Sequence, residues 1–292
     1  MASSLGRRQL EANGQHLKDL RRLTFDDHND YATAWTPDGE AVLFQSDRNG
    51  QYDIFKQALD RDAADPIVTG PGNKHDPAVS PDGAWILYVQ DVAGGNTRIM
   101  RVPIAGGPPQ LVLEGPGIDG SECSRSPRSL CVLGERTPDG KQYVFTALDP
   151  MQGRGHELVR VDLKQPILSY YWSLSPDGSR IAFTQSEKDQ RDRRIEVIPL
   201  ASGKRVEVLL RGQTWPDSIR WTVDGKGLYF GSTPAAGGGL FFVDMEGRSS
   251  DVLRQQRHPF SFSIRGVPSP DGRYLAVSGR VMVSNIWLLE NF

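Results

Sequence analysis

The sequence predicts an all-β fold built from repeated four-stranded units, and three observations lead to this prediction. First, a phrase of the type Ser/Thr-Pro-Asp-Gly recurs along the 292 residues. Second, an aliphatic residue stands five positions after the proline position of each copy. Third, strand-like runs flank each copy and further runs follow at similar offsets. Repeats of roughly 40–50 residues with four short strands each are typical of the blades of a β-propeller.

The recurring phrase is expected to form a tight turn between the first two strands of each repeat. Proline presets φ near about −65°, the aspartate accepts local backbone N–H bonds, and glycine adopts the positive φ that closes the turn. The aspartates are therefore expected to be turn residues rather than a carboxylate cluster. The copies in register are Thr36–Gly39, Ser80–Gly83, a degenerate Ser126–Ser129, Ser175–Gly178, Thr222–Gly225 and Ser269–Gly272. A further copy, Thr137–Gly140, is assigned to a later turn of the third repeat.

The two ends of the chain predict how the ring closes. The sixth repeat stops after its third strand-like run, Asn285–Glu290, and so lacks an outer strand. Residues 20–24 resemble an outer strand but precede the first repeat. We expect this N-terminal strand to complete the last blade, since an open blade would leave an unpaired edge. The prediction is a six-bladed β-propeller of four-stranded antiparallel blades over residues 19–292, preceded by a flexible leader or linker, residues 1–18.

Composition excludes several classes of protein. The net charge of −2 argues against nucleic-acid binding, which needs clustered Lys and Arg. No run approaches the roughly 20 apolar residues of a membrane span. The first residues are not followed by the apolar core of a signal peptide. A chain of this length buries about three quarters of its surface, so it needs no metal or disulfide staple to fold. We expect a monomer without a cofactor.

Several phrases resemble a known family. The boxes that begin at Trp35 and Trp221 and the run Leu43–Gly50 resemble the TolB-type propeller repeat. The closing run Ser284–Phe292 is similar to the C-terminal sensor propellers of bacterial serine/threonine kinases and winged-helix regulators. This resemblance implies a binding scaffold. It leaves the compartment open: cytoplasmic for a full-length chain, extracytoplasmic for the sensor part of a membrane kinase.

Catalytic motifs give no positive indication of an enzyme. The kinase glycine loop, His-Arg-Asp and Asp-Phe-Gly motifs do not occur in the 292 residues, and neither does G-x-S-x-G or H-E-x-x-H. The segment Gly115–Gly120 matches G-x-G-x-x-G, but pyrophosphate binding needs a helix N-terminus directly behind it. A strand is expected there, so the match is interpreted as a chance one.

Cys123 and Cys131 are the only cysteines. They lie on opposite arms of the degenerate third turn, where their Cβ atoms could come within disulfide reach. In an oxidising compartment a disulfide and two free thiols are equally open, and in the cytosol two reduced, buried thiols are expected. Both alternatives stay open.

The predicted binding site follows from the position of residues within the repeat, not from a sequence motif. In a propeller, the segments that lead into the inner strands gather around one mouth of the central channel. Aromatic, acidic and arginine side chains there form a plausible recognition surface, although Tyr171 and Trp215 could instead pack between blades. The predicted channel-mouth residues are His28, Asp30, Tyr31, His75, Asp76, Asp119, Glu122, Tyr170, Tyr171, Trp215, Asp217, Phe262 and Arg265.

These observations favour a non-enzymatic binding or sensor module that recognises a protein, peptide or small ligand as part of a bacterial signalling protein. One alternative is a metal-assisted lyase or hydrolase at the channel mouth, with His28, His75, Asp76 and Glu122 as ligands. Another is a TolB-like periplasmic protein of envelope assemblies.

Overall fold

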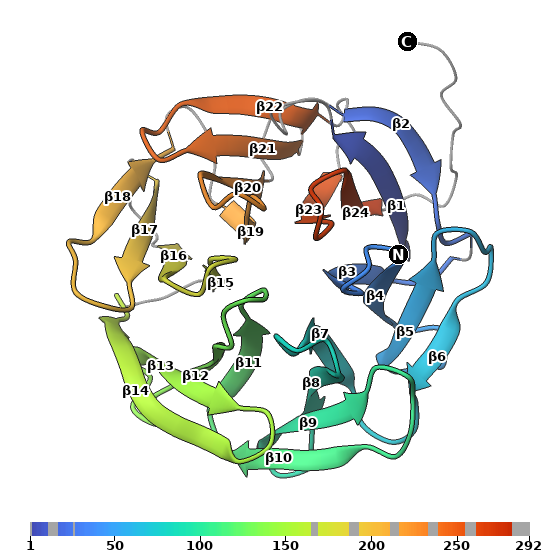
Figure 1. Ribbon diagram of the computed structural model, residues 1–292, viewed down its shortest axis with the longest axis horizontal. Coiled ribbons are helices and arrows are strands. Elements are labelled where there is room, and N and C mark those ends of the chain that lie inside the picture. The colour runs from blue at the N-terminus through green and yellow to red at the C-terminus, as the bar shows by residue number, and fades with distance from the viewer. Residues whose placement is uncertain are drawn as a thin grey trace.

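The computed structural model describes residues 2–10, 17–25, 27–164, 169–186, 193–210, 216–232, 239–254 and 261–281. Within these ranges, six four-stranded antiparallel sheets are arranged in a ring (Figure 1), and their inner strands line a central channel. The innermost strand of every sheet is the first that the chain forms after crossing from the preceding sheet. In the part of the chain so described, no helix is long and apolar enough to cross a membrane.

Five of the sheets, here called blades 1 to 5, are each continuous in sequence and run outward from the channel. Blade 1 consists of β3 (Asp30–Trp35), β4 (Ala41–Ser46), β5 (Asp53–Ala58) and β6 (Asp65–Val68). Blade 2 consists of β7 (Lys74–Val79), β8 (Trp85–Asp91), β9 (Thr97–Pro103) and β10 (Gln110–Gly115). Blade 3 consists of β11 (Ile118–Cys123), β12 (Cys131–Arg136), β13 (Gln142–Asp149) and β14 (Gly153–Asp162). Blade 4 consists of β15 (Ser169–Leu174), β16 (Arg180–Ser186), β17 (Arg194–Pro199) and β18 (Val206–Leu209). Blade 5 consists of β19 (Pro216–Trp221), β20 (Gly227–Ser232), β21 (Gly239–Asp244) and β22 (Ser249–Arg254).

The remaining sheet, the closing sheet, joins the two ends of the chain. Its order from the rim inward is β2 (Leu17–Arg22), β1 (Ala2–Leu10), β24 (Tyr274–Val281) and β23 (Ser261–Pro268). Strand β1 pairs antiparallel with β24 over eight residue pairs, from Ala2↔Val281 to Gln9↔Tyr274. Strand β2 then pairs with β1.

The predicted fold class, six blades with the last completed by residues 20–24, is therefore wrong. Five blades, not six, follow the repeat continuously, and the closing sheet takes half of its strands from the N-terminal segment. Residues 2–10 were expected in a flexible leader but form the third strand of this sheet, counted outward from the channel. Its outer strand is Leu17–Arg22. The expected third strand, 285–290, lies outside the described residues. An exposed sheet edge pairs with any extended segment that reaches it, so the repeat pattern did not identify the segment that fills it.

The hydrophobic core lies between neighbouring sheets. Phe44, Phe183 and Phe230, on the second strands of blades 1, 4 and 5, are completely buried. Tryptophan side chains at the ends of inner strands also link sheets through hydrogen bonds. Trp35 Nε1 donates to the Val267 carbonyl oxygen over 2.9 Å, and Trp221 Nε1 donates to the Ser173 carbonyl oxygen over 3.0 Å.

The structure confirms the predicted role of the repeated phrase. The Thr36 hydroxyl donates to Asp38 Oδ1 over 2.5 Å, and the same carboxylate oxygen accepts the Glu40 N–H over 3.0 Å. Gly39 has a φ of 74°. Equivalent hydroxyl–carboxylate bonds recur in the other turns, at Asp82, Asp139, Asp177, Asp224 and Asp271. These aspartates are turn residues.

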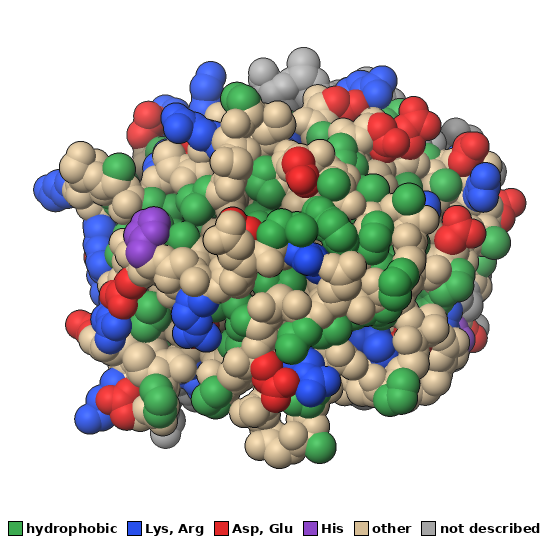
Figure 2. All heavy atoms as spheres, turned by 60° about the horizontal axis from the view of Figure 1, so that its bottom comes forward, with side chains coloured by type: hydrophobic (Ala, Val, Ile, Leu, Met, Phe, Trp, Pro, Cys, Tyr) green, Lys and Arg blue, Asp and Glu red, His purple; other side chains and the backbone are tan. Residues whose placement is uncertain are grey.

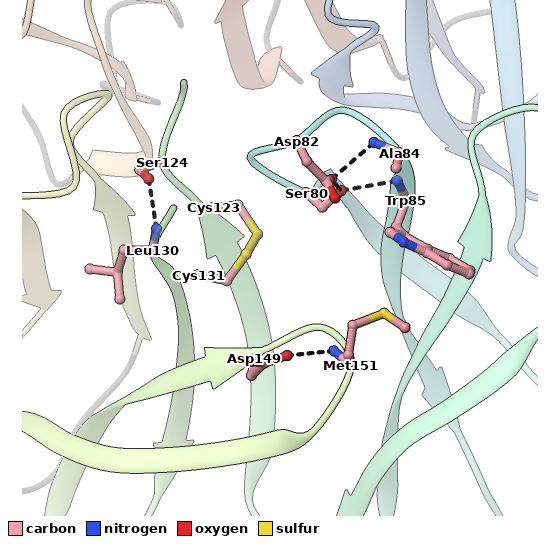
Figure 3. Close-up of a disulfide and its surroundings, with 10 residues drawn as sticks. All are labelled: Ser80, Asp82, Ala84, Trp85, Cys123, Ser124, Leu130, Cys131, Asp149 and Met151. Atoms are coloured by element: carbon pink, nitrogen blue, oxygen red, sulfur yellow. Dashed lines mark hydrogen bonds between the residues drawn. A yellow bond between two sulfur atoms is a disulfide. The ribbon is translucent and has the colours of Figure 1, made fainter. Parts of the chain in front are cut away.

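The third turn differs from the predicted register. Ser124, not Ser126, occupies the position of Ser80: its N–H donates to the Leu130 carbonyl oxygen over 2.8 Å, and its Oγ accepts the Leu130 N–H over 3.1 Å. Figure 3 shows this turn beside that of blade 2, where Ser80 Oγ accepts the Trp85 N–H. The closing bond spans six residues in blade 3 and five in blade 2. The turn is one residue longer and lacks the Pro-Asp-Gly sequence, which explains why its register was misassigned.

Charges of both signs occur across the side of the molecule in Figure 2, with apolar side chains between them. Acidic and basic residues pair across neighbouring strands, as in the 2.7 Å contact between Arg98 Nε on β9 and Glu114 Oε2 on β10. Interspersed charge of this kind is typical of an ordinary solvated surface.

Candidate functional site

The central channel contains a cavity of about 790 Å³, lined by inner strands of all six described sheets and by the turns that follow them. Seven of the thirteen predicted site residues line it. These are His75, Asp76, Asp119, Glu122, Tyr170, Tyr171 and Arg265.

The other predicted residues lie elsewhere. Asp30 is completely buried, and its Oδ1 lies 3.2 Å from Arg48 Nη2, so it stabilises blade 1. His28 Nδ1 lies 3.7 Å from Asp47 Oδ1, away from the cavity. Neither Tyr31 nor Asp217 is part of the lining, although the Arg265 guanidinium, which does line the cavity, lies over the Tyr31 ring. Trp215 and the side chain of Phe262 lie outside the described residues.

Asp76 has an unusual backbone conformation. Its φ of 49° makes it the one non-glycine residue with positive φ in the described ranges. Such conformations are unfavourable for L-residues, least so for Asn and Asp, and persist where the surroundings enforce them. Here the Asp76 N–H donates to Gln45 Oε1 of blade 1 over 3.0 Å. The irregular backbone lies in a break of the β7–β8 pairing and directs the carboxylate into the channel.

His75 connects Asp76 with a second carboxylate. Its Nδ1 lies 2.9 Å from Asp76 Oδ2, and its Nε2 lies 3.3 Å from Asp91 Oδ1. Burial alone would lower the pKa of His75, but the two carboxylates outweigh burial and raise this pKa to about 9. Burial would raise the pKa of Asp76, yet His75, Arg265 and Arg220 together lower it. At neutral pH an imidazolium therefore lies between two carboxylates.

Asp119 and Glu122, on β11, have different surroundings. Asp119 Oδ2 accepts a 2.7 Å bond from the Tyr143 hydroxyl, and Oδ1 accepts a 3.3 Å bond from the Tyr170 hydroxyl. Burial and the nearby Asp76 raise the pKa of Asp119. Burial also raises the pKa of Glu122, although Arg220 opposes this change.

Glu122 forms an ion pair that spans three blades. Its Oε1 lies 3.0 Å from Arg220 Nη1 on blade 5. Its Oε2 accepts bonds from the Leu174 N–H over 2.8 Å and from the Ser173 hydroxyl over 3.2 Å, both on blade 4. The carboxylate and the guanidinium thus neutralise one another and tie blades 3, 4 and 5 together.

Sequence reasoning missed Arg220 because it considered only the segments leading into the inner strands. A comparison of registers would have found it. The residues one position before the ends of the inner strands are Ala34, Ala78, Glu122, Ser173, Arg220 and Val267. Four of these are small or apolar, so an acid and a base at equivalent positions of blades 3 and 5 indicate a pair across the channel.

The structure contains the disulfide between Cys123 and Cys131, with a Cα–Cα distance of 3.9 Å (Figure 3). The two cysteines are direct cross-strand partners, at the position that Val79 and Ile86 occupy in blade 2. The cross-link closes the turn that carries Arg125.

Arg125 crosses the channel at its turn end. Its Nη1 donates to the Pro270 carbonyl oxygen and its Nη2 to the Pro268 carbonyl oxygen, each over 3.2 Å. Pro268 ends β23 and Pro270 lies in the turn that follows, so both carbonyls lie on the inner hairpin of the closing sheet, opposite blade 3 in the ring (Figure 1).

The metal ligands considered from the sequence do not gather. His28 does not line the cavity that contains His75, Asp76 and Glu122. Across the described part of the chain, no group of three or more His, Cys, Asp or Glu side chains could hold a metal ion.

The fold and the channel define a β-propeller with a central cavity lined by both charged and apolar side chains. Residues 9–171, more than half of the chain, match the family model of the TolB beta propeller domain. The chain belongs to this family, as the repeat resemblance predicted. The further similarity to kinase sensors and winged-helix regulators stays a prediction.

Individual relatives are distant and functionally diverse. The chain is 23% identical to dipeptidyl-peptidase 5 of Porphyromonas gingivalis over 84% of its own length and 43% of that protein, so it spans less than half of this relative. TolB of Acinetobacter baumannii superposes with a TM-score of 0.60 at 18% identity, over 87% of this chain and 64% of that one. A gluconolactonase of Xanthomonas campestris superposes with a TM-score of 0.57 at 14% identity, over 94% of each chain. Similarity at this level shows the fold alone.

Proposed function

We propose that this chain is a non-enzymatic recognition module that binds a peptide or small ligand in the channel and serves as the sensing part of a longer protein. The observation that carries the proposal is the cavity itself. Its volume of about 790 Å³ falls within the roughly 300–1,000 Å³ of typical ligand sites. The opposite charges of Asp76 and Arg265 both face it.

The state of the polar groups supports binding rather than catalysis. Both ring nitrogens of His75 already contact carboxylates, so the imidazole is poorly placed to transfer a proton to or from a substrate. Glu122 is occupied by Arg220 and by two donors of blade 4. These groups are held rigidly by the protein, as is typical of a preorganised binding site.

The disulfide supports a location in an oxidising compartment, which is one of the two compartments that the sequence left open. Thiol alkylation of the chain isolated from its native source, with and without prior reduction, tests this point. Labelling of Cys123 and Cys131 without reduction would contradict it.

A channel-blocking variant tests the proposed function. A Cβ added at Gly120, which lines the cavity, meets no atom within 4 Å, so we expect Gly120→Phe to project its ring into the channel and to keep the fold. Leu111→Phe, at a side chain 55% exposed on β10, is the matched control. Thermal shifts are measured with a panel of amino acids, short peptides, sugars and organic acids.

We expect at least one compound to stabilise the wild-type chain and Leu111→Phe but not Gly120→Phe. Equal stabilisation of all three proteins would place binding outside the channel and contradict the proposal. Conversion of the bound compound, followed by mass spectrometry, would show an enzyme instead.

A second candidate is the propeller part of a peptidase, favoured by the alignment with dipeptidyl-peptidase 5 over 84% of this chain. In that case the channel would guide peptides to a catalytic domain. Hydrolysis of a chromogenic dipeptidyl substrate by the longer native protein, lost on Gly120→Phe, would favour this candidate over a sensor.

A further inference from the structure

Equivalent positions of the six inner strands divide into two kinds. One position lies three residues before the end of each inner strand. In blades 1 to 5 and the closing sheet, in this order, it is occupied by Ala32, Asp76, Gly120, Tyr171, Ser218 and Arg265. All six residues line the cavity. Small residues in blades 1, 3 and 5 therefore alternate with large polar residues in blades 2 and 4 and in the closing sheet. The small residues leave space between the polar ones.

Arg265 presents an unsatisfied cation to this space. Its guanidinium lies over the Tyr31 ring, 5.6 Å from the centroid, and this contact orients the side chain. The described residues provide no hydrogen-bond or ion-pair partner for its N–H groups. A guanidinium has five donors arranged to hold a carboxylate through two parallel bonds.

Asp76 presents the complementary anion. Gln45 holds its N–H and His75 holds its Oδ2, whereas its Oδ1 has no hydrogen-bond partner among the described residues. The side chain is 44% exposed, toward the channel. A strained, rigidly held carboxylate with one free oxygen is suited to accept an ammonium group.

The two charges interact only at longer range, where Arg265 helps to lower the pKa of Asp76. In the described part of the chain, Arg265 and Asp76 form no ion pair, although each lines the same cavity. Arg220 pairs with Glu122, and Asp119 accepts two neutral tyrosine hydroxyls. The His75 imidazolium contacts both Asp76 and Asp91 and so balances only one of these two carboxylates, which leaves a net negative charge at Asp76. A ligand that is only an anion would be repelled by the Asp76 carboxylate, and one that is only a cation would be repelled by the Arg265 guanidinium.

We propose that the channel binds a small zwitterion, a free α-amino acid or a short peptide with free termini, with its carboxylate on Arg265 and its ammonium on Asp76. This inference rests on the proposed recognition function and names its ligand class. Tyr171 also lines the cavity, while part of its ring packs against the core between blades 4 and 5.

Isothermal titration with defined probes tests the pairing. The probes are the free amino acids, dialanine and trialanine, each compared with its N-acetylated and its C-amidated form. For wild-type protein we expect at least one free probe to bind and both capped forms to bind at least tenfold more weakly. Comparing the free amino acids with the two peptides shows which of these two classes of zwitterion the channel binds.

Two variants assign each end of the ligand. Asp76→Asn preserves the shape and tolerates the positive φ, and Arg265→Gln removes the cation. We expect each variant to weaken the free probe at least tenfold. N-acetylation of the probe should then cause no further loss of affinity for Asp76→Asn. C-amidation should cause no further loss of affinity for Arg265→Gln. Asp139→Asn and Arg160→Gln, exposed on blade 3, are the controls and should bind as wild type does.

The possible failures are distinguishable. Capped probes that bind wild type as well as free ones, or variants that bind as wild type does, would overturn the zwitterion assignment. If none of these probes binds but another compound binds and is lost in Gly120→Phe, the assignment falls and the recognition function stands. If no compound of any class depends on Gly120, both fall.

Discussion

Reduction of the Cys123–Cys131 disulfide should lower the free energy of unfolding by an amount that can be worked from the structure. The cysteines are eight residues apart in sequence, so the cross-link restricts a short loop of the unfolded chain. For a loop of this length the chain-entropy relation gives about 2.5 kcal/mol at 25 °C. This is a large share of the roughly 5–15 kcal/mol by which domains are stable.

The assay is urea unfolding followed by tryptophan fluorescence, with and without a phosphine reductant. The double variant Cys123→Val, Cys131→Ile is the control, because it reproduces the apolar pair Val79–Ile86 of blade 2. Its stability should not change with the reductant. The reduced wild-type chain should lose about 2.5 kcal/mol while keeping its native fluorescence spectrum.

Two results would refute this reasoning. A loss below about 1 kcal/mol would show that the unfolded chain does not gain the freedom that the entropy model assigns to it. A loss above about 5 kcal/mol would show that the cross-link instead holds the folded turn, including the Arg125 contacts across the channel.

Three further predictions concern stability. Lys74→Met should cost about 3–5 kcal/mol in urea unfolding, because Lys74 Nζ lies 2.8 Å from Asp53 Oδ1 and both side chains are buried; a cost below that of an exposed ion pair would contradict the burial argument. The pKa of His75, raised from 6.5 to about 9, should provide stability that is complete below pH 6.5 and lost as the pH rises through 9; unfolding at several pH values should show this slope, and His75→Gln should remove it. Gly134→Ala should lower stability by about 1–3 kcal/mol, since the added Cβ would collide with the Tyr143 hydroxyl; an unchanged melting temperature would argue against this tight contact.

The turns were predictable because their chemistry is local. Thr36, Asp38 and Gly39 satisfy one another within a few residues, so the same phrase folds in the same way wherever it occurs. The proximity of Cys123 and Cys131 followed from the same hairpin argument, since direct cross-strand partners are set by the turn between them. Seven of the channel residues followed from the repeat, because a ring of equivalent strands brings equivalent positions together.

Other features depend on contacts between distant segments. Asp30 was expected at the channel mouth, but Arg48 offers a partner inside blade 1, and a buried carboxylate needs such a partner. The pairing of Glu122 with Arg220 joins segments that are far apart in sequence but face each other across the channel.

By itself, the sequence determined the repeat, its turns and the antiparallel four-stranded unit, because these follow from hydrogen bonds and hydrophobic periodicity over short distances. Only the tertiary structure decided that residues 2–10 supply a strand of the closing sheet and that Asp76 and Arg265 face one cavity without pairing. Both depend on which segments meet when the ring closes, and no local pattern encodes that meeting.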